Sequence, residues 1–269
     1  MQTPNKLKEI KTEIKQLKNP AKAKILQGFF KTGKGEYGEG DIFLGITVPL
    51  QRNLVKKYWQ SLNLTDVDKL LKSKIHEERL IALLILVNKF QSACRRHPER
   101  SEGSQTLTDS SPSGLRMTPK KIFQFYLSHT KYINNWDLVD LSAPNIIGEY
   151  LINKNKQILY KLAKSNNLWE RRIAILATFR FIKQKNSQHT LKLAKILLKD
   201  KHDLIHKAVG WMLREVGKRC SIKTLTNFLD QEVRQMPRTT LRYAIERLPK
   251  KLRKHYLFIK HDRRYNTKI

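Results

Sequence analysis

Four side chains that could do chemistry occupy matching points of a repeated sequence pattern: one acid, one arginine and two tryptophans, namely Asp140, Arg172, Trp136 and Trp211. A carboxylate can stabilise a developing positive charge and orient a water molecule. The face of an indole attracts cations, and an arginine can hold a phosphate. The set is therefore suited to chemistry in which positive charge develops beside a phosphate group.

The repeated pattern places a basic residue just ahead of small and aliphatic residues, in segments 170–175, 205–210 and 241–245. Their basic residues, Arg172, Lys207 and Arg242, are each 35 positions apart, and one period before Arg172 lies Asp137. A constant period of this size predicts stacked helix pairs, an α-solenoid. The period is close to that of TPR repeats, but the TPR pattern of Trp and Tyr is missing. We therefore favour HEAT-like repeats.

Counted from these basic positions, Trp136 lies at −1 and Asp140 at +3, whereas Arg172 lies at 0 and Trp211 at +4. Residues four apart are one helical turn apart. We therefore expect all four side chains to project from one side of three consecutive helices onto a shared concave surface. In the ordinary alternative, each tryptophan belongs to the core and Asp140 pairs with a neighbouring cation.

The periodicity of apolar residues is helical throughout, and segments 80–86 and 172–176 mix Ala with bulky aliphatic residues. Long alternating stretches are missing, so the sequence predicts an all-α fold of antiparallel helix pairs. Segment 65–68 has a capping-type pattern, and Pro49 and Pro237 stand where first turns are expected.

A single repeat domain over residues 1–269 is expected, with one interruption. Arg79 begins an earlier copy of the pattern but precedes Asp137 by 58 positions, which exceeds one period by 23. The polar, serine-rich segment 94–118 accounts for the excess, and we predict a disordered surface insertion there, with a functional lid as the alternative. Residues 250–269 form a basic C-terminal tail that could extend the last helix.

The composition is strongly basic, with 54 Lys and Arg against 23 Asp and Glu and a formal net charge of +31. Such an excess repels itself, so a polyanionic partner is expected, nucleic acid before an anionic membrane surface or a merely solvated basic face. Arg79, Arg172, Lys207 and Arg242 could form a row of cations that follows a phosphate backbone. They could also simply extend from a solvated face.

The sequence predicts a soluble, cytoplasmic protein. The longest apolar run, residues 80–87, is far shorter than a membrane span, and the N-terminus has no apolar signal core. The two cysteines, Cys94 and Cys220, make neither a disulfide framework nor a zinc site, as suits a reducing compartment.

Several partial motifs favour a structural interpretation. The glycine pattern at 33–38 follows no strand and has acidic neighbours, so a loop is expected instead of a nucleotide site. His76 begins a zincin-like motif whose second ligand is replaced by Leu80, and the pair His202 and His206 has no third ligand. We therefore predict no metal and no cofactor, and the sequence supports no Ser or Cys nucleophile.

Three blocks carry a resemblance to a known family: residues 135–144 (NWDLVDLSAP), 168–176 (LWERRIAIL) and 207–215 (KAVGWMLRE), with shorter matches at 43–46 and 236–238. The chain resembles the DNA alkylation repair enzyme family, the AlkD-like DNA glycosylases, over nearly its whole length except the insertion. The resemblance implies a superhelical HEAT-like solenoid that grips duplex DNA in a basic concave groove. It also implies excision of cationic N3- or N7-alkylated purines, as base-excision repair without a base-binding pocket.

Matched by position, Asp140 resembles the catalytic carboxylate, and Trp136 and Trp211 resemble the aromatic pair beside the lesion. Phe29 stands where the family can have Tyr, so any hydroxyl contact there is lost. Arg172 resembles the DNA-contacting arginine of the family. The other side chains that we expect to bind DNA are Arg79, Lys207, Arg242 and Arg214.

Two other kinds of protein remain open. A non-enzymatic helical-repeat protein that binds nucleic acid would use the same positive charge, but a carboxylate on a basic surface would weaken its hold on phosphate. A HEAT-type scaffold for protein partners needs no large positive charge, and steep salt dependence of DNA binding would argue against it. A groove for one duplex can work in a monomer, which is the expected state.

Overall fold

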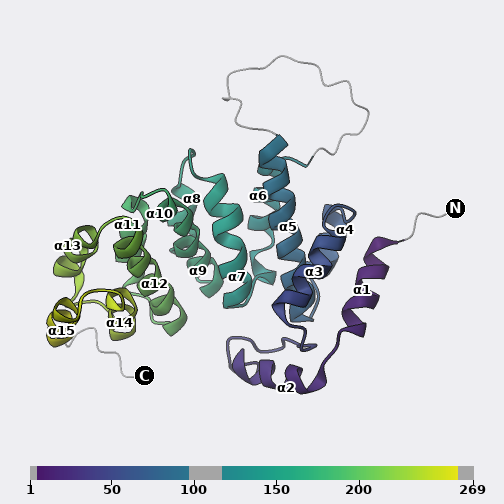
Figure 1. Ribbon diagram of the computed structural model, residues 1–269, viewed down its shortest axis with the longest axis horizontal. Coiled ribbons are helices and arrows are strands. Elements are labelled where there is room, and N and C mark those ends of the chain that lie inside the picture. Colours follow the sequence, from purple (N-terminus) through teal and green to yellow (C-terminus); the bar gives the residue numbers. More distant parts are fainter. Residues whose placement is uncertain (1–4, 97–116, 260–269) are drawn as a thin grey trace, which may run out of the picture. The chain divides into compact units, whose positions relative to one another are not determined.

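The computed structural model describes residues 5–96 and 117–259, which are helical apart from their connections (Figure 1). The chain divides into two compact units, residues 1–142 and 143–269. The one β-type pairing among the described residues is an isolated parallel bridge between Ile42 and Ile75. The predicted all-α fold class is therefore confirmed, while a single domain over the whole chain stays a prediction.

The described part of the first unit is built of helices and their connections (Figure 1). Their bounds are α1 (Lys6–Gln16), α2 (Pro20–Phe29), α3 (Val48–Tyr58), α4 (Leu64–Leu71), α5 (His76–Arg96), α6 (Pro119–Ser128), the short 3₁₀ helix η1 (Thr130–Tyr132) and α7 (Trp136–Ala143).

Helix α5 is the centre of the first unit and packs against α3, α4 and α6. Residues 76–87 are buried without a break. Residues 80–87 are apolar on all sides of the helix and must therefore be surrounded by protein, whereas the charged residues 76–79 need polar partners. The neighbouring α4 begins with a capping box, in which the side chain of Asn63 and that of Asp66 each accept the other's backbone N–H. The cap lies two residues before the predicted Thr65.

The connection between α2 and α3 carries the glycine pattern and is a loop, as predicted. The second half of this loop is bonded to the chain at the start of α5 by two backbone hydrogen bonds. Ile42 N donates to Lys74 O at 3.0 Å, and His76 N donates to Ile42 O at 2.8 Å. Gly45 has a positive φ of 84°, and a Cβ there would approach Asn19 O to 2.2 Å. Only glycine fits this position.

In the second unit α8 packs on α9 and α11 packs on α12, while α13 and α14 both pack on α12. Its elements are the π-helical turn η2 (Pro144–Gly148), α8 (Gln157–Leu162), α9 (Leu168–Ala177), α10 (Phe179–Lys183), α11 (Gln188–Leu197), α12 (Asp203–Arg219), α13 (Ile222–Glu232), α14 (Arg238–Ile245) and α15 (Lys250–Phe258).

Helix α12 is the centre of the second unit and packs most extensively against α14. Gly210 permits this approach, since a Cβ there would lie 2.5 Å from Tyr243 Cβ and 2.6 Å from Thr240 O. The glycine of the block at 207–215 therefore has a packing role between two successive repeats.

The repeat positions of the sequence all fall within helices. Arg79 lies on α5 and Asp137 on α7, while the three basic residues 35 positions apart lie on α9, α12 and α14. Most of the predicted insertion, residues 97–116, lies outside the described residues, and α5 itself continues to Arg96. Residues 250–258 of the predicted tail form α15, a separate helix after Pro249 and no extension of α14. None of the described helices has both the length and the apolar composition needed to cross a bilayer.

Candidate functional site

Helix α7 presents the predicted catalytic acid and one predicted lesion-contacting tryptophan, Asp140 and Trp136, one turn apart. Both side chains are partly exposed, so Asp140 is not sealed in the interior. The helix starts where Asn135 accepts the backbone N–H of Trp136 at 2.8 Å. It widens into η2 at Pro144, which has no N–H to offer the carbonyl of Asp140 four residues earlier.

Trp136 lies on a group of aromatic rings from the loop and helix at its side. Its ring stacks on Phe30 at 5.0 Å with an interplanar angle of 15°, and Phe30 in turn stacks on Phe43 at 4.9 Å. Phe29, which is 62% exposed, meets Trp136 edge-to-face at 5.9 Å. The structure thus brings Phe29 and Trp136 together, and Trp136 has one face in the core and one edge at the surface.

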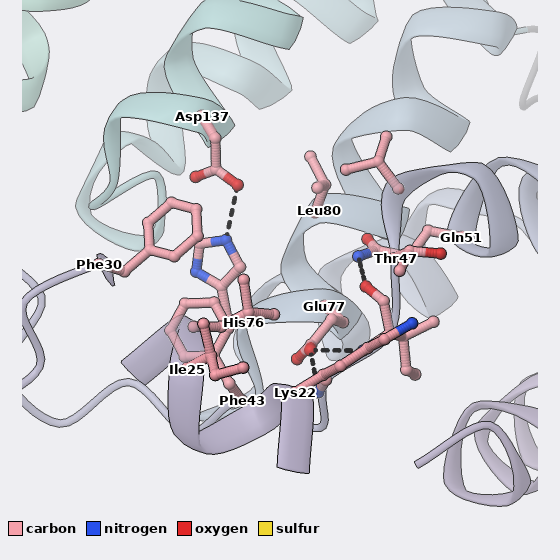
Figure 2. A pocket seen from close by; sticks show the side chains of 14 residues that line it. Lys22, Ile25, Phe30, Phe43, Thr47, Gln51, His76, Glu77, Leu80 and Asp137 are labelled. Atoms are coloured by element: carbon pink, nitrogen blue, oxygen red, sulfur yellow. Dashed lines mark hydrogen bonds and ion pairs between the residues drawn. The ribbon is translucent and has the colours of Figure 1, made fainter. Parts of the chain in front are cut away.

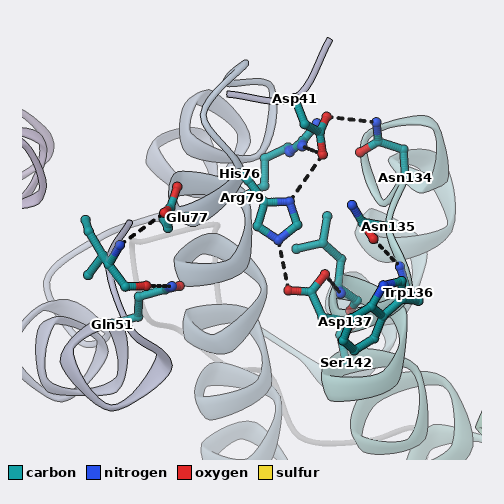
Figure 3. A network of polar contacts seen from close by, with 12 residues as sticks. Asp41, Gln51, His76, Glu77, Arg79, Asn134, Asn135, Trp136, Asp137 and Ser142 are labelled. Carbon is teal, nitrogen blue, oxygen red and sulfur yellow. Dashed lines mark hydrogen bonds and ion pairs between the residues drawn. The ribbon is translucent and has the colours of Figure 1, made fainter. Parts of the chain in front are cut away.

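A buried polar network lies beneath these rings (Figure 3). His76 at the start of α5 contacts Asp137 through Nε2 at 2.8 Å and Asp41 through Nδ1 at 3.2 Å. Arg79, one turn further along α5, forms an ion pair with Asp41 at 2.6 Å. The network connects α5, the glycine loop and the first turn of α7.

The charges in this network stabilise one another. Burial alone would favour the neutral carboxyl of Asp41, but hydrogen bonds from His76 and Arg79 lower its pKa below the usual value. Burial would likewise lower the pKa of His76, but the carboxylates of Asp137 and Asp41 more than offset this and raise it above 6.5. Both carboxylates therefore favour the protonated form of the imidazole.

The negative charge of Asp140 reaches the fully buried Tyr126 of α6. Burial raises the pKa of Tyr126, the bond with Ser142 at 2.8 Å opposes this, and the charge of Asp140 raises the pKa further. Ser142 also donates to the carbonyl of Leu138 within α7. Asp140 therefore lies on a helix whose inner face is fixed by polar contacts.

An apolar cavity of about 170 Å³ opens beside the network (Figure 2). Phe30, Phe43, Ile25 and Leu80 are among its apolar lining residues, and His76 and Asp137 also line it. The Glu77 carboxylate accepts three backbone N–H groups, from Leu44, Gly45 and Ile46, at 2.8 to 3.2 Å. This contact fixes the loop that carries Phe43.

In the second unit, the predicted Arg172 and Trp211 have separate surroundings. Arg172 is 5% exposed, and its guanidinium donates to the carbonyl of Leu204 at 2.5 Å, which ties α9 to α12. Trp211 is partly exposed and lies 6.0 Å from the ring of Phe179 at an angle of 42°.

The remaining predicted DNA-binding cations of this unit lie nearer to solvent. Lys207 pairs with Asp203 one turn earlier at 2.7 Å, and Arg214 pairs with Glu246. Arg242 is exposed, and no described residue forms an ion pair with it.

The expected surface row of cations needs a correction at two positions. Arg79 and Arg172 are each 5% exposed, and both are held by protein acceptors. The period places them correctly on their helices, but the side of the helix that they occupy packs against neighbouring elements. A repeat period specifies where a residue lies along its helix, whereas the packing of neighbouring elements determines how deeply its side chain is buried.

His202 and His206, the pair noted in the sequence, form hydrogen bonds with the backbone. His202 caps α12 by accepting the N–H of Leu204 at 3.1 Å, and His206 Nε2 donates to the carbonyl of Asp200 at 2.6 Å. Among residues 5–96 and 117–259, no group of three or more His, Cys, Asp or Glu side chains is arranged to hold a metal ion.

The sequence interpretation missed the network of Asp41, His76 and Asp137 and its contact with Phe30 and Phe43. His76 was considered only as part of a broken zinc motif. A usable signal was present: four charged or polar residues, HEER at 76–79, run directly into the apolar stretch of 80–87. Ionisable residues at the start of a buried helix need buried partners.

Comparison with known proteins agrees with this architecture. The family model described as DNA alkylation repair enzyme matches residues 10–248, and the chain belongs to that family. A solved structure described as a predicted DNA alkylation repair enzyme from Enterococcus faecalis aligns with a TM-score of 0.61 and 17% identity, over 87% of this chain and 97% of that chain. No curated protein sequence matches significantly.

The family match confirms the resemblance stated from the three sequence blocks, and the structural match confirms the fold of stacked helix pairs. Membership supports a role in DNA repair. The roles of individual residues stay predictions, because a relative of low identity establishes only the fold.

Proposed function

We propose that the chain is a DNA glycosylase that excises cationic N3- or N7-alkylated purines from duplex DNA. The observation that carries the proposal is the arrangement on α7, where the partly exposed Asp140 lies one turn from a tryptophan held by the rings of Phe29 and Phe30. Membership of the DNA alkylation repair enzyme family and the net charge of +31 support DNA as the substrate.

The proposed reaction is hydrolysis of the bond between C1′ and the purine nitrogen. Alkylation gives the purine a positive charge, so the base leaves with the bonding electron pair and becomes neutral. The sugar then carries the positive charge, which the carboxylate of Asp140 stabilises. Water attacks C1′, and its proton passes to Asp140 or to solvent. The step needs no metal and no cofactor.

The tryptophans and the basic residues have supporting roles in this proposal. The faces of Trp136 and Trp211 favour the charged lesion and the sugar cation, by about 0.5–2 kcal/mol each depending on desolvation. Phe29 adds apolar surface beside Trp136. Lys207, Arg214 and Arg242 bind phosphates, and the buried Arg79 and Arg172 act by holding their helices in place.

The test measures release of 7-methylguanine and 3-methyladenine from methylated duplex DNA under single-turnover conditions. The wild-type chain is expected to release base, and Asp140→Asn is expected to slow release about 100-fold or more, with DNA affinity nearly unchanged. Asp68→Asn is the matched control, since Asp68 is a partly exposed carboxylate of the same unit on α4. It should retain the wild-type rate.

The rival functions give different results in the same experiments. A non-enzymatic nucleic-acid-binding protein would bind DNA with steep salt dependence and release no base. A scaffold for protein partners would bind DNA weakly or without such dependence. Full excision by Asp140→Asn would refute the role of Asp140.

A further inference from the structure

His76 lies enclosed between two carboxylates at the point where three elements meet (Figure 3). The side chain is 2% exposed, with Asp41 Oδ2 at 3.2 Å from Nδ1 and Asp137 Oδ2 at 2.8 Å from Nε2. An ionised carboxylate only accepts hydrogen bonds, so both ring nitrogens must carry protons to satisfy both contacts. The geometry therefore indicates an imidazolium.

The other charged groups around His76 come from every element that packs on it. Arg79 of α5 pairs with Asp41 and disfavours the charge on His76, while Asp137 of α7 favours it. Glu77 is fully engaged with the backbone of the loop at 44–46, and Lys22 of α2 lines the neighbouring cavity. The two aspartates are therefore the direct partners of the imidazole.

His76 is mechanically connected to Trp136 by two routes. Asp137 is the residue directly after Trp136, and its other carboxylate oxygen accepts the N–H of Leu138 at 2.8 Å in the first turn of α7. On the second route, the imidazole stacks on Phe43 at 4.4 Å, Phe43 stacks on Phe30, and Phe30 stacks on Trp136. A change at His76 thus reaches both the backbone and the ring of Trp136.

We infer that His76 is a positioning residue, whose bridge between Asp41 and Asp137 fixes the first turn of α7 so that Trp136 and Asp140 keep their orientation. The inference rests on the proposed function for its catalytic consequence. The coupling of His76 to Trp136 is a structural property, and it can be measured without an excision assay.

The test variant is His76→Gln, which retains a hydrogen-bonding side chain but has no positive charge. His129→Gln is the matched control, because His129 also donates from Nε2 to an aspartate, Asp68, at 2.7 Å in the same unit. His129 stacks on Phe125 and belongs to no part of the Trp136 stack. Thermal melting identifies any variant that fails to fold.

The excision assay should show a loss of at least tenfold in single-turnover rate for His76→Gln, with DNA affinity within about threefold of the wild type, whereas His129→Gln keeps the rate. The wild-type rate should fall as pH rises from 6.5 through the pKa of His76, and His129→Gln should retain this fall. Asp41→Asn removes one stabilising carboxylate, so the fall should move to lower pH. A role only in folding would not move the pH profile.

A second readout follows the indole N–H resonance of Trp136 by NMR, assigned by its loss in Trp136→Phe. In the wild type this resonance should shift with the titration of His76, and His76→Gln should abolish the pH dependence while His129→Gln retains it. Unchanged resonance and excision in His76→Gln would overturn the inference. If the wild type releases no base, the proposed function fails, and the Trp136 resonance still decides whether His76 positions this site.

Discussion

The two tryptophans predicted to contact the lesion have very different surroundings in the structure. Trp136 stacks on Phe30 with nearly parallel planes, meets Phe29 edge-on and is tied through Asp137 to a buried charge network. Among the residues that the structure describes, Trp211 has one aromatic neighbour, Phe179, at 6.0 Å and a tilted angle. Trp136 therefore has more aromatic and polar contacts around it than Trp211.

The same contrast divides the basic residues at the repeat positions. Arg79 is buried and pairs with Asp41, whereas Lys207 lies at the surface and pairs with Asp203 on its own helix. A buried charge needs its partner, while an exposed pair competes with water. Equivalent positions thus differ in depth: Arg79 in the first unit and Arg172 in the second are buried, whereas Lys207 lies near the surface.

Breaking the buried ion pair should produce the largest effect on stability. Arg79→Met leaves the buried carboxylate of Asp41 without its arginine partner, and we expect a loss of about 3 kcal/mol or more in the free energy of unfolding. Lys207→Met should cost about 1 kcal/mol or less. Urea unfolding of both variants measures the difference, and equal losses would contradict the contrast between buried and exposed repeat positions.

Removing each tryptophan should give the next largest difference. Trp136→Ala deletes one member of the aromatic stack and is expected to cost about 2–3 kcal/mol, against about 1 kcal/mol for Trp211→Ala. Thermal or urea unfolding provides the comparison. A greater loss for Trp211→Ala would show that its environment is the more rigid one.

The pH dependence of stability should report on the buried network of His76 and Asp41 in the first unit. Because the pKa of His76 is raised in the folded state, its contribution is complete below pH 6.5 and is lost as pH rises through the folded pKa. Asp41 has a lowered pKa, so its contribution is present above pH 3.8 and is lost as pH falls below that value. Unfolding measured from pH 6 to 9 should show a decline that His76→Gln lacks.

The smallest expected effect concerns the exposed cation Arg242. If its side chain contacts one phosphate, Arg242→Gln should weaken DNA binding modestly and lower the slope of log affinity against log salt by about 1. Arg79→Met changes a buried residue and should leave that slope unchanged as long as the protein is folded. Salt titrations of DNA binding by fluorescence anisotropy test both expectations.

Much of the fold follows from the sequence because the relevant signals are local. The 35-residue period placed Arg172, Lys207 and Arg242 on α9, α12 and α14, and the apolar run at 80–87 identified the central part of α5. The helical spacing of Trp136 and Asp140 placed both on α7. These inferences need only helical geometry and the burial of apolar surface.

The tertiary structure decided what surrounds each of these positions. Asp41, His76 and Asp137 are separated by 35 and 61 residues, and no local pattern pairs them. Likewise, Arg79 and Arg172 share a repeat position with Lys207, and only packing determines that the arginines are buried. Sequence specifies which face of a helix a residue occupies, but the elements that cover this face come from distant parts of the chain, so burial, pairing and charge state are fixed only when the helices assemble.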